Sequence, residues 1–473
     1  MNSLQDILRQ AELRPSHPAI VERLPSGGRV ETTYGELAHR VRRAANDFTH
    51  LGVAEGQRVG LMARQGLEFI ESALGIMLAG ACVAPLPMDT PADGLRQVRD
   101  RCQLHHLSRA SSGVLETFNG VRVVDDDGDS QFRALAPAYM RFTSGTTSER
   151  KGVMIGHGSI VARTDAANEI LRLGPEDRIL WVLPMVHHFV VSIMLYLRTG
   201  ATIVLPASSL PQVMLDAATA ERVTVTYASP YQYQLLSRIG QPGDLDSLRL
   251  AVSTTAGLTA DIANQFLARW NMPLSQALGI IEVGLPVMNI DCARTAPTAL
   301  GRPLPAYDVW LRAEGGGRVV SDGTPGTAGE ICIRGVGLFD AYVNPWIPAK
   351  TFVGADGFRT GDVGWFDADG NLHMQGRHKN RISVAGMKFF AEEVEAVLAC
   401  HPAIEICRVY ATAHPRLGEV PAAEVNLKPG TSLTQPELMA FCRGRLEHHK
   451  IPREVRIVEQ IALTATGKVK RWA

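Results

Sequence analysis

Residues Arg141–His157 read RFTSGTTSERKGVMIGH, in which a hydroxyl-rich centre lies between two apolar runs. The apolar runs Ala138–Phe142 and Gly152–Ile155 predict two short strands, so the centre is a loop that joins them. The polar residues of this loop are Thr143, Ser144, Gly145, Thr146, Thr147, Ser148 and Lys151. Consecutive turn amides form concavities that bind anions, and hydroxyl and ammonium donors suit a polyphosphate. The stretch therefore predicts a phosphate-binding loop.

Two other interpretations of this loop have to be weighed. A Walker phosphate loop needs Gly just before its Lys and Ser or Thr just after it, whereas Lys151 lies between Arg150 and Gly152. That pattern is excluded. A solvated turn is the remaining alternative, because Ser and Thr are common in loops. Motifs elsewhere in the chain have to decide between this turn and a phosphate site.

The segment TSGTTSERKGV, residues 143–153, resembles the TSGTTG-x-PKGV phosphate loop of the adenylate-forming superfamily. That superfamily includes acyl-CoA synthetases, adenylation domains of peptide synthetases and luciferases. Ser148 replaces the usual Gly and Arg150 the usual Pro, while His157 matches a histidine commonly found just after the loop. The resemblance implies that ATP is the polyphosphate and that Thr143 takes part in catalysis. The expected ATP contacts in this loop are Thr143, Ser144, Gly145, Thr146, Thr147 and Lys151.

Composition places the chain among globular proteins. Its 473 residues are 45% hydrophobic and 20% charged, and the formal net charge is zero, so no nucleic-acid or anionic-membrane partner is indicated. The seven cysteines include no C-x-x-C pair, which favours reduced thiols. The N-terminus lacks a basic segment followed by an apolar run. The longest apolar run, Ser72–Met88, is interrupted by Pro85 and Pro87. We therefore expect a cytoplasmic protein without membrane spans.

Periodic segments alternate between helix and strand. Thr33–Leu51 and Glu68–Ala79 have helical spacing, whereas Arg58–Ala63 and Ala81–Leu86 read as strands. Such alternation predicts an α/β fold with parallel sheets covered by helices. Together with the resemblance it implies a large N-terminal domain of parallel and mixed sheets, residues 1–378. A small mobile α+β C-terminal domain, residues 379–473, would follow it.

The substrate pocket is expected after a predicted strand at Ile179–Pro184. The segment PMVHHFVVS, residues 184–192, resembles PMAHNYPLS, which lines the carboxylate pocket of aryl-acid-activating members. Amino-acid-activating members carry an Asp near this place, but no acidic residue occurs between Leu183 and Leu195. The resemblance implies substrate contacts by His187, His188, Phe189 and Ser192.

Two further segments resemble nucleotide-contacting motifs. The predicted strand Leu248–Leu258 exposes a loop in which the family places adenine and substrate contacts, here Thr255, Ala256 and Gly257. The segment QALGIIEVGL, residues 276–285, takes the place of the family's YGSTE motif, and aryl-acid members read FGMAE there. Leu278 stands in place of the aromatic residue of that motif, and Ile281 stands in place of its Thr. The other residues of interest in this segment are Gly279, Ile280, Glu282 and Leu285.

Glu282 is the expected Mg²⁺ ligand, and it is assigned a catalytic role. A lone carboxylate in an apolar strand is costly to bury without a cation or other partner, which favours a functional role. Leu278 can pack on adenine but cannot stack as an aromatic ring does. Gly279, Ile280 and Leu285 are expected to line the acid pocket.

Four residues of the second half complete the expected site. FRTGD, residues 358–362, matches the family's WFRTGD, and a carboxylate can accept hydrogen bonds from two vicinal hydroxyls, so Asp362 is the expected ribose contact. In GRHKNRI, residues 376–382, the resemblance implies that Arg377 reaches ribose or phosphate and that Lys379 is a hinge. Gly386 would line the tunnel for the thiol arm.

Lys468 lies in LTATGKVKR, residues 463–471, which resembles P-x-T-x-TGK-x-x-R. In the family this Lys contacts the substrate carboxylate and the α-phosphate. The resemblance therefore implies a catalytic Lys468. Only Trp472 and Ala473 follow Arg471, so we expect no fused carrier domain.

The combined motifs predict an adenylate-forming carboxylate ligase. ATP and Mg²⁺ would activate a carboxylic acid, preferably an aryl acid, and CoA or a separate phosphopantetheine carrier protein would accept the acyl group. A medium- or long-chain fatty acid ligase and a stand-alone amino-acid adenylating enzyme remain alternatives. A luciferase-type oxygenase shares these motifs, and only its product would distinguish it. An inactive nucleotide sensor would be expected to lose Asp362 or Lys468, and both are present.

Overall fold

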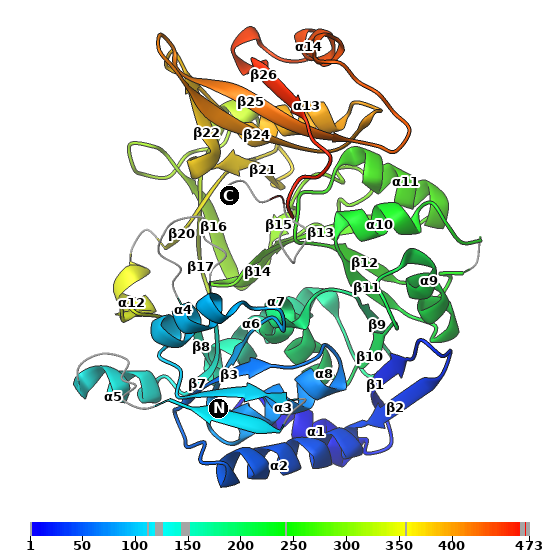
Figure 1. Ribbon diagram of the computed structural model, residues 1–473, viewed down its shortest axis with the longest axis vertical. Helices are drawn as coiled ribbons and strands as arrows, with labels where there is room; N and C mark the ends of the chain where they lie inside the picture. The colour runs from blue at the N-terminus through cyan, green and yellow to red at the C-terminus, as the bar shows by residue number, and fades with distance from the viewer. Residues whose placement is uncertain are drawn as a thin grey trace. The chain divides into compact units, whose positions relative to one another are not determined.

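The computed structural model describes residues 2–110, 113–118, 126–142, 152–241, 244–354, 357–463 and 469. The chain forms two compact units, which Figure 1 shows coloured by residue number. The first unit comprises Met1–Pro297, Leu304–Asp308 and Arg334–Ala355. The second comprises Thr298–Pro303, Val309–Ile333 and Asp356–Ala473.

One sheet of the first unit carries the strands that matter most for function. Its strands run in the order β14-β13-β12-β11-β9-β10-β1-β2. Neighbours from β13 to β1 are parallel, whereas β14 and β2 are antiparallel to their neighbours. The bounds are β1 Pro18–Arg23, β2 Arg29–Thr33, β9 Arg178–Trp181, β10 Thr202–Leu205, β11 Val225–Ala228, β12 Leu250–Ser253, β13 Leu274–Ile280 and β14 Gly284–Met288.

The second sheet of this unit is mixed and runs β19-β18-β8-β7-β4-β3-β5-β6. Strands β7, β4, β3 and β5 are parallel, while β8 and β18 are antiparallel to their neighbours. The bounds are β3 Arg58–Met62, β4 Cys82–Pro85, β5 His106–Arg109, β6 Val114–Thr117, β7 Pro137–Phe142, β8 Gly152–Gly156, β18 Ala341–Val343 and β19 Ile347–Pro348. Strand β18 comes from far along the chain and pairs directly with β8, so it brings residues 337–343 beside the start of α6.

Helices pack on these sheets through apolar faces. Helix α2 begins at a capping box in which Thr33 and Glu36 satisfy each other's backbone N–H groups. The bounds are α1 Gln5–Leu13, α2 Tyr34–His50, α3 Leu67–Leu78, α4 Ala92–Cys102, α5 Asp126–Ala134, α6 His157–Leu171, α7 Met185–His188, α8 Met194–Thr199, α9 Pro211–Ala220, α10 Pro230–Leu236, α11 Ala260–Trp270 and α12 Ala349–Phe352.

The second unit contains two smaller sheets. One runs β16-β17-β20-β21, and the other runs β23-β22-β25-β24 with β26 added parallel to β25. The bounds are β16 Tyr307–Arg312, β17 Gly329–Gly335, β20 Phe358–Phe366, β21 Leu372–Arg377, β22 Arg381–Val384, β23 Met387–Phe390, α13 Ala391–Ala399, β24 Ile404–His414, β25 Gly418–Leu427, α14 Gln435–Arg443 and β26 Glu454–Ile457. An apolar core between α13, α14 and their sheet makes this an α+β module.

The expected fold class is confirmed, with local corrections. Periodicity predicts a helix over Ser159–Leu173 ended by Gly174, but helix α6 begins at His157 and ends at Leu171, because Arg172 adopts a left-handed conformation. Strand β9 ends at Trp181, and Gly386 turns the chain into strand β23 before α13 begins. The boundary between residues 378 and 379 marks an expected hinge and stays a prediction.

The contact between α2 and α3 yields a stability prediction. A Cβ atom on Gly75 would lie 2.6 Å from the Ala44 Cβ and 3.2 Å from backbone atoms of Ala44 and Ala45. Gly75→Ala should therefore lower the free energy of unfolding by about 1–3 kcal/mol, since a packed interface cannot relax without moving backbone. Gly158→Ala is the matched control, because this helical glycine has open space around it. Urea unfolding measures both, and equal stabilities would contradict the packing argument.

Candidate active site

Strands β9, β11, β12 and β13 of the first sheet are parallel, so their carboxyl ends lie side by side at the same end of the sheet (Figure 1). Parallel sheets place ligands outside the carboxyl ends of their strands. The segments that follow three of these strands are those that resemble substrate and nucleotide motifs: α7 after β9, the loop 254–257 after β12 and the turn 281–283 after β13. The topology therefore brings the separate motifs of the first unit to one edge.

The segment after β9 carries an irregular helix. Helix α7 passes into a π-helical turn, Phe189–Ile193, before α8 begins. Such π-turns are rare and frequently lie at functional sites. His188 is half-buried and meets the rings of Trp181 and Tyr227 edge-on, with centroid distances of 5.7 and 6.3 Å. An imidazole is thus held in an aromatic environment at the end of β9.

The other expected substrate residues of this segment differ in exposure. His187 is half-buried, and its backbone carbonyl accepts a hydrogen bond from Arg141. Phe189 is fully buried and packs on Tyr139 and Phe69 at centroid distances of 6.3 and 5.6 Å. Phe189 therefore contributes to the core beneath the segment in this structure.

Ser192 is buried inside the π-turn. Burial raises the pKa of Tyr227, and the neighbouring hydroxyls of Thr254 and Ser192 oppose that shift. Burial likewise raises the pKa of Tyr196, again opposed by Ser192. Ser192 is thus one member of a buried hydroxyl cluster behind His188, which no sequence pattern indicated.

The loop after β12 contains a strained residue. Thr255 has a φ of 75°, a left-handed conformation that a β-branched residue rarely adopts. Ala256 and Gly257 are exposed beside it, and the N–H of Leu258 donates to the Gln276 side chain at 2.8 Å. Strained backbone is concentrated at functional sites, where the surrounding structure holds it. The geometry agrees with the expectation that this loop contacts a ligand.

Glu282 lies in the turn between β13 and β14, so its expected place within a strand is wrong. Gly284, with a φ of 106°, turns the chain back so that β14 pairs antiparallel to β13. The Glu282 side chain is half-buried, and the Tyr342 hydroxyl donates to its Oε1 at 3.4 Å. Burial raises the pKa of Glu282, while Tyr342 and the positive charges of Arg141 and Arg163 oppose this rise.

The neighbouring residues of this turn form a mixed surface. Leu278, Ile280 and Ile281 are half-buried, Gly279 is exposed and Leu285 is buried. Burial lowers the pKa of Arg141 at the end of β7, and the charge of Glu282 opposes that shift. Sequence reasoning missed Arg141, Arg163 and Tyr342 because their relation to Glu282 exists only after folding.

In the second unit, two expected nucleotide contacts are paired. Arg377 Nε lies 2.6 Å from Asp362 Oδ1, because the two residues are register partners on β20 and β21. Asp362 is 2% exposed, and its N–H donates to the Thr360 hydroxyl at 3.0 Å. Lys379 is exposed in a 3₁₀ turn, His378–Asn380, and Gly386 turns the β22–β23 hairpin with a φ of 87°.

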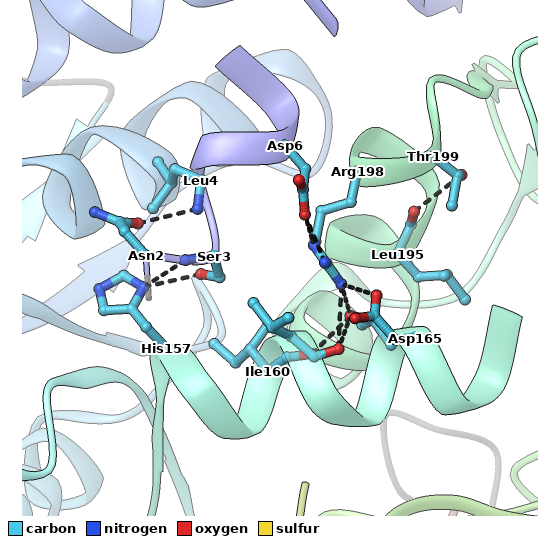
Figure 2. Close-up of polar contacts among 12 residues, drawn as sticks. Asn2, Ser3, Leu4, Asp6, His157, Ile160, Asp165, Leu195, Arg198 and Thr199 are labelled. Atoms are coloured by element: carbon cyan, nitrogen blue, oxygen red, sulfur yellow. Dashed lines mark hydrogen bonds and ion pairs between the residues drawn. The ribbon is translucent and has the colours of Figure 1, made fainter. Parts of the chain in front are cut away.

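Several expected site residues lie outside the described residues. They are Thr143, Ser144, Gly145, Thr146, Thr147, Lys151 and Lys468. His157, which follows the phosphate loop, is described and packs against the N-terminal segment: its Nδ1 lies 2.9 Å from the Ser3 hydroxyl (Figure 2). Burial lowers the pKa of His157 to about 4.

The N-terminal segment is also fastened by an ion pair network. Arg198 on α8 contacts Asp6 of α1 at 2.5 Å and Asp165 of α6 at 2.9 Å (Figure 2). The same guanidinium donates to the hydroxyl of Thr164. These contacts hold residues 3–6 against α6 and α8, so His157 belongs to a structural junction at the start of α6.

A metal would need phosphate oxygens in addition to protein ligands. In the part of the chain that the structure describes, no group of three or more His, Cys, Asp or Glu side chains is placed to hold one. Mg²⁺ is commonly bound by one or two carboxylates together with substrate phosphates and water. Glu282, a half-buried carboxylate near the charges of Arg141 and Arg163, fits that limited role. Within the described ranges no helix is long and apolar enough to cross a membrane.

Comparison with protein families identifies the chain. Residues 7–343 match the family described as AMP-binding enzyme, and residues 393–468 match the AMP-binding enzyme C-terminal domain. The chain therefore belongs to the AMP-binding enzyme family, within the adenylate-forming superfamily.

Three curated relatives extend over nearly the whole chain. Feruloyl-CoA synthase from Amycolatopsis sp is 28% identical over 98% of this chain and 96% of its own length. Indoleacetate–CoA ligase from Aromatoleum aromaticum is 28% identical over 98% of this chain and 95% of its own length. Oxalate–CoA ligase from Arabidopsis thaliana is 26% identical over 95% of this chain and 94% of its own length.

Solved structures share the fold over the full length. The o-succinylbenzoate CoA synthetase of Bacillus subtilis, bound to its acyl adenylate, has a TM-score of 0.85 at 20% identity and covers 100% of this chain and 97% of its own. ATP-bound MatB from Rhodopseudomonas palustris has a TM-score of 0.83 at 22% identity, with coverages of 99% and 97%. The chain is an AMP-forming acid–CoA ligase, which couples ATP cleavage to ligation of a carboxylic acid through an adenylate.

The strained loop generates a prediction. Thr255→Ala keeps a Cβ atom at a φ of 75°, whereas Thr255→Gly removes it, so the Gly variant should be more stable than the Ala variant by about 1 kcal/mol. Both variants lose the hydroxyl, and both should weaken ATP binding if the loop contacts the nucleotide. Urea unfolding and ATP titration measure the two effects. A more stable Ala variant would show that the strain is absent in solution.

Proposed function

We propose that the acid activated by this ligase is aromatic, and that the segment after β9 recognises it. The observation that carries the proposal is the edge-on packing of His188 against Trp181 and Tyr227, whose rings stack on each other, after the carboxyl end of the strand that precedes the segment. An imidazole in such surroundings can donate or accept a hydrogen bond with a ring substituent, and apolar walls suit an aromatic ring.

Charge argues against an amino acid as substrate. An ammonium group buried without an anionic partner is costly, so an amino-acid pocket needs a carboxylate near this segment. No acidic residue occurs between Leu183 and Leu195, and a neutral imidazole is a poor anchor for a cation. The stand-alone amino-acid adenylating enzyme is therefore the least supported alternative.

The relatives support an aromatic acid without deciding it. Two of them are named for ferulate and indoleacetate, both aromatic acids, and a third is named for oxalate, a small dicarboxylate. A medium- or long-chain fatty acid remains the second candidate, because Ile280, Ile281 and Leu285 would also suit an alkyl chain. The chemistry of the reacting groups is the same for all of these acids.

The reaction has two chemical steps, and an acyl adenylate is the intermediate between them. An oxygen of the acid attacks the α-phosphorus of ATP, the bond to pyrophosphate breaks, and an acyl adenylate forms. The thiol of CoA then attacks the acyl carbon, and AMP leaves with the former acid oxygen. Gly386 is expected to lie along the path of the thiol arm of CoA.

Each expected site residue has a role in this scheme. The backbone and hydroxyl donors of Thr143–Thr147, with Lys151, would hold the phosphates, and Lys468 would neutralise charge on the acid and α-phosphate. Asp362 and Arg377 would bind ribose, and Thr255, Ala256, Gly257, Leu278 and Gly279 would contact adenine or acid. Mg²⁺, when bound by Glu282, would supply further stabilisation of phosphate charge. Lys379 would serve as the hinge, and a cytoplasmic location stays a prediction.

The substrate class is tested by kcat/KM for substituted benzoates, cinnamates, medium-chain acids and α-amino acids. We expect an aromatic acid to be preferred, and His188→Ala to lower its kcat/KM about tenfold or more, since one lost polar contact in a buried site costs about 1–3 kcal/mol. His106→Ala is the matched control: His106 is also buried but lies on β5 of the other sheet. Preference for an α-amino acid, or for alkyl acids with no effect of His188→Ala, would contradict the proposal.

Lys468 is tested by separating the two half-reactions. Lys468→Ala should reduce adenylate formation by about a hundredfold or more, because a charge that stabilises the phosphoryl transition state is removed. Transfer from a supplied acyl adenylate to CoA should be affected far less. Pyrophosphate exchange measures the first step and thioester formation the second. Equal losses in both would mean that Lys468 has a structural role only.

A further inference from the structure

Arg163 on α6 is a fully buried arginine, with 2% of its surface exposed. It hydrogen-bonds backbone carbonyls: its Nε donates to Gly337 at 2.8 Å and its Nη1 to Ile281 at 3.0 Å. Burial lowers the pKa of Arg163 to about 10, so the guanidinium is still charged at neutral pH. A buried cation is costly to desolvate, which makes its placement informative.

Two glycines, Gly337 and Gly284, allow the backbone to approach Arg163 closely. A Cβ atom on Gly337 would lie 2.6 Å from the Arg163 Cβ, and one on Gly284 would lie 3.3 Å from it. Both glycines have positive φ angles, 65° and 106°, which side-chain-bearing residues rarely adopt. Two separate segments thus approach Arg163 closely: Gly284 at the end of the Glu282 turn, and Gly337 before β18.

Three consecutive carbonyls of the turn are held by three different donors. Arg163 holds the carbonyl of Ile281, the N–H of Phe339 donates to that of Glu282 at 2.7 Å, and the hydroxyl of Tyr307 donates to that of Val283 at 3.3 Å. These donors come from α6, from the segment before β18 and from Tyr307, all of which belong to the first unit. The backbone on both sides of Glu282 is therefore fixed from outside its own hairpin.

The segment that holds Glu282 is itself anchored to the start of α6. Asp340 accepts a hydrogen bond from the N–H of Gly156 at 2.7 Å and from the Ser159 hydroxyl at 3.0 Å. The N–H of Asp340 donates to Met154 of β8 at 2.9 Å. Residues 337–340 thus connect the Glu282 turn to the strand that follows the predicted phosphate loop.

We propose that Arg163 is a positioning residue for Glu282: it fixes the backbone of the turn so that the carboxylate is held in place for the cation that accompanies ATP. The proposal rests on the proposed function of Glu282 as the residue that holds this cation. The Arg163 guanidinium donates to the backbone carbonyls of Gly337 and Ile281, so its contact with the turn is to backbone and not to the Glu282 carboxylate. It acts through Glu282 alone.

The test measures ATP binding with Mg²⁺ and with EDTA by calorimetry on the full chain. In the unaltered protein and in Arg58→Met, Mg²⁺ should tighten ATP binding by the same factor. Arg58, on β3, is the matched control, because its side chain is also buried, with 1% exposed. Like Arg163 it donates to a backbone carbonyl, that of Gln103, at 2.7 Å. Glu282→Gln and Arg163→Met should each lose most of that factor, and Arg163→Lys should restore part of it. Binding in EDTA should change less than about threefold.

The double variant Glu282→Gln/Arg163→Met should lose no more of the metal effect than Glu282→Gln alone, because both changes remove one function. Additive losses would overturn the inference, as would a full metal effect in Arg163→Met when Glu282→Gln has lost it. A full metal effect in Glu282→Gln would instead reject the proposed role of Glu282. If Arg163→Met does not fold, Tyr307→Phe removes one donor from the same turn. It should lose part of the metal effect, and an unchanged effect would overturn the inference.

Discussion

The placement of the half-buried Glu282 carboxylate near the charges of the half-buried Arg141 and the buried Arg163 is the constraint on which the first unit's candidate site depends. A buried carboxylate is costly, and Arg141 and Arg163 offset part of that cost through their charges. The turn that carries Glu282 is fixed by donors from three segments, so its geometry depends on α6, Tyr307 and the segment before β18 folding together. The position of Glu282 is therefore set by tertiary packing.

Sheet topology explains why segments far apart in the sequence lie close together. Parallel pairing from β9 through β11 and β12 to β13 places the segments after β9, β12 and β13 at the same edge. Each segment departs from regular structure there: a π-turn after β9, a left-handed Thr255 after β12 and a glycine-closed turn after β13. In the second unit, the antiparallel register of β20 and β21 places Asp362 opposite Arg377.

Much of this arrangement could be predicted from the sequence. Apolar periodicity gave the α2 and α3 helices and the strands β3, β4 and β7 within one or two residues, and motif resemblance gave the fold class. The turn at Glu282 was missed because QALGIIEVGL, apart from Gln276 and Glu282, consists of apolar residues and glycines and reads as one strand. Only the folded chain shows Gly284 at a positive φ. Arg163 was missed because its partners are backbone carbonyls more than 100 residues away, which leave no pattern in its own helix.

The central claim is that the Glu282 turn is the cation and phosphate centre of the enzyme. Its most direct test is anomalous diffraction from crystals of the full chain grown with Mn²⁺ and a non-hydrolysable ATP analogue, because Mn²⁺ takes the same oxygen ligands as Mg²⁺. The account predicts an anomalous peak within about 2–2.5 Å of a Glu282 carboxylate oxygen or of a water bound to it, bridging to the phosphates. A peak on the phosphates with no connection to Glu282 would contradict the account.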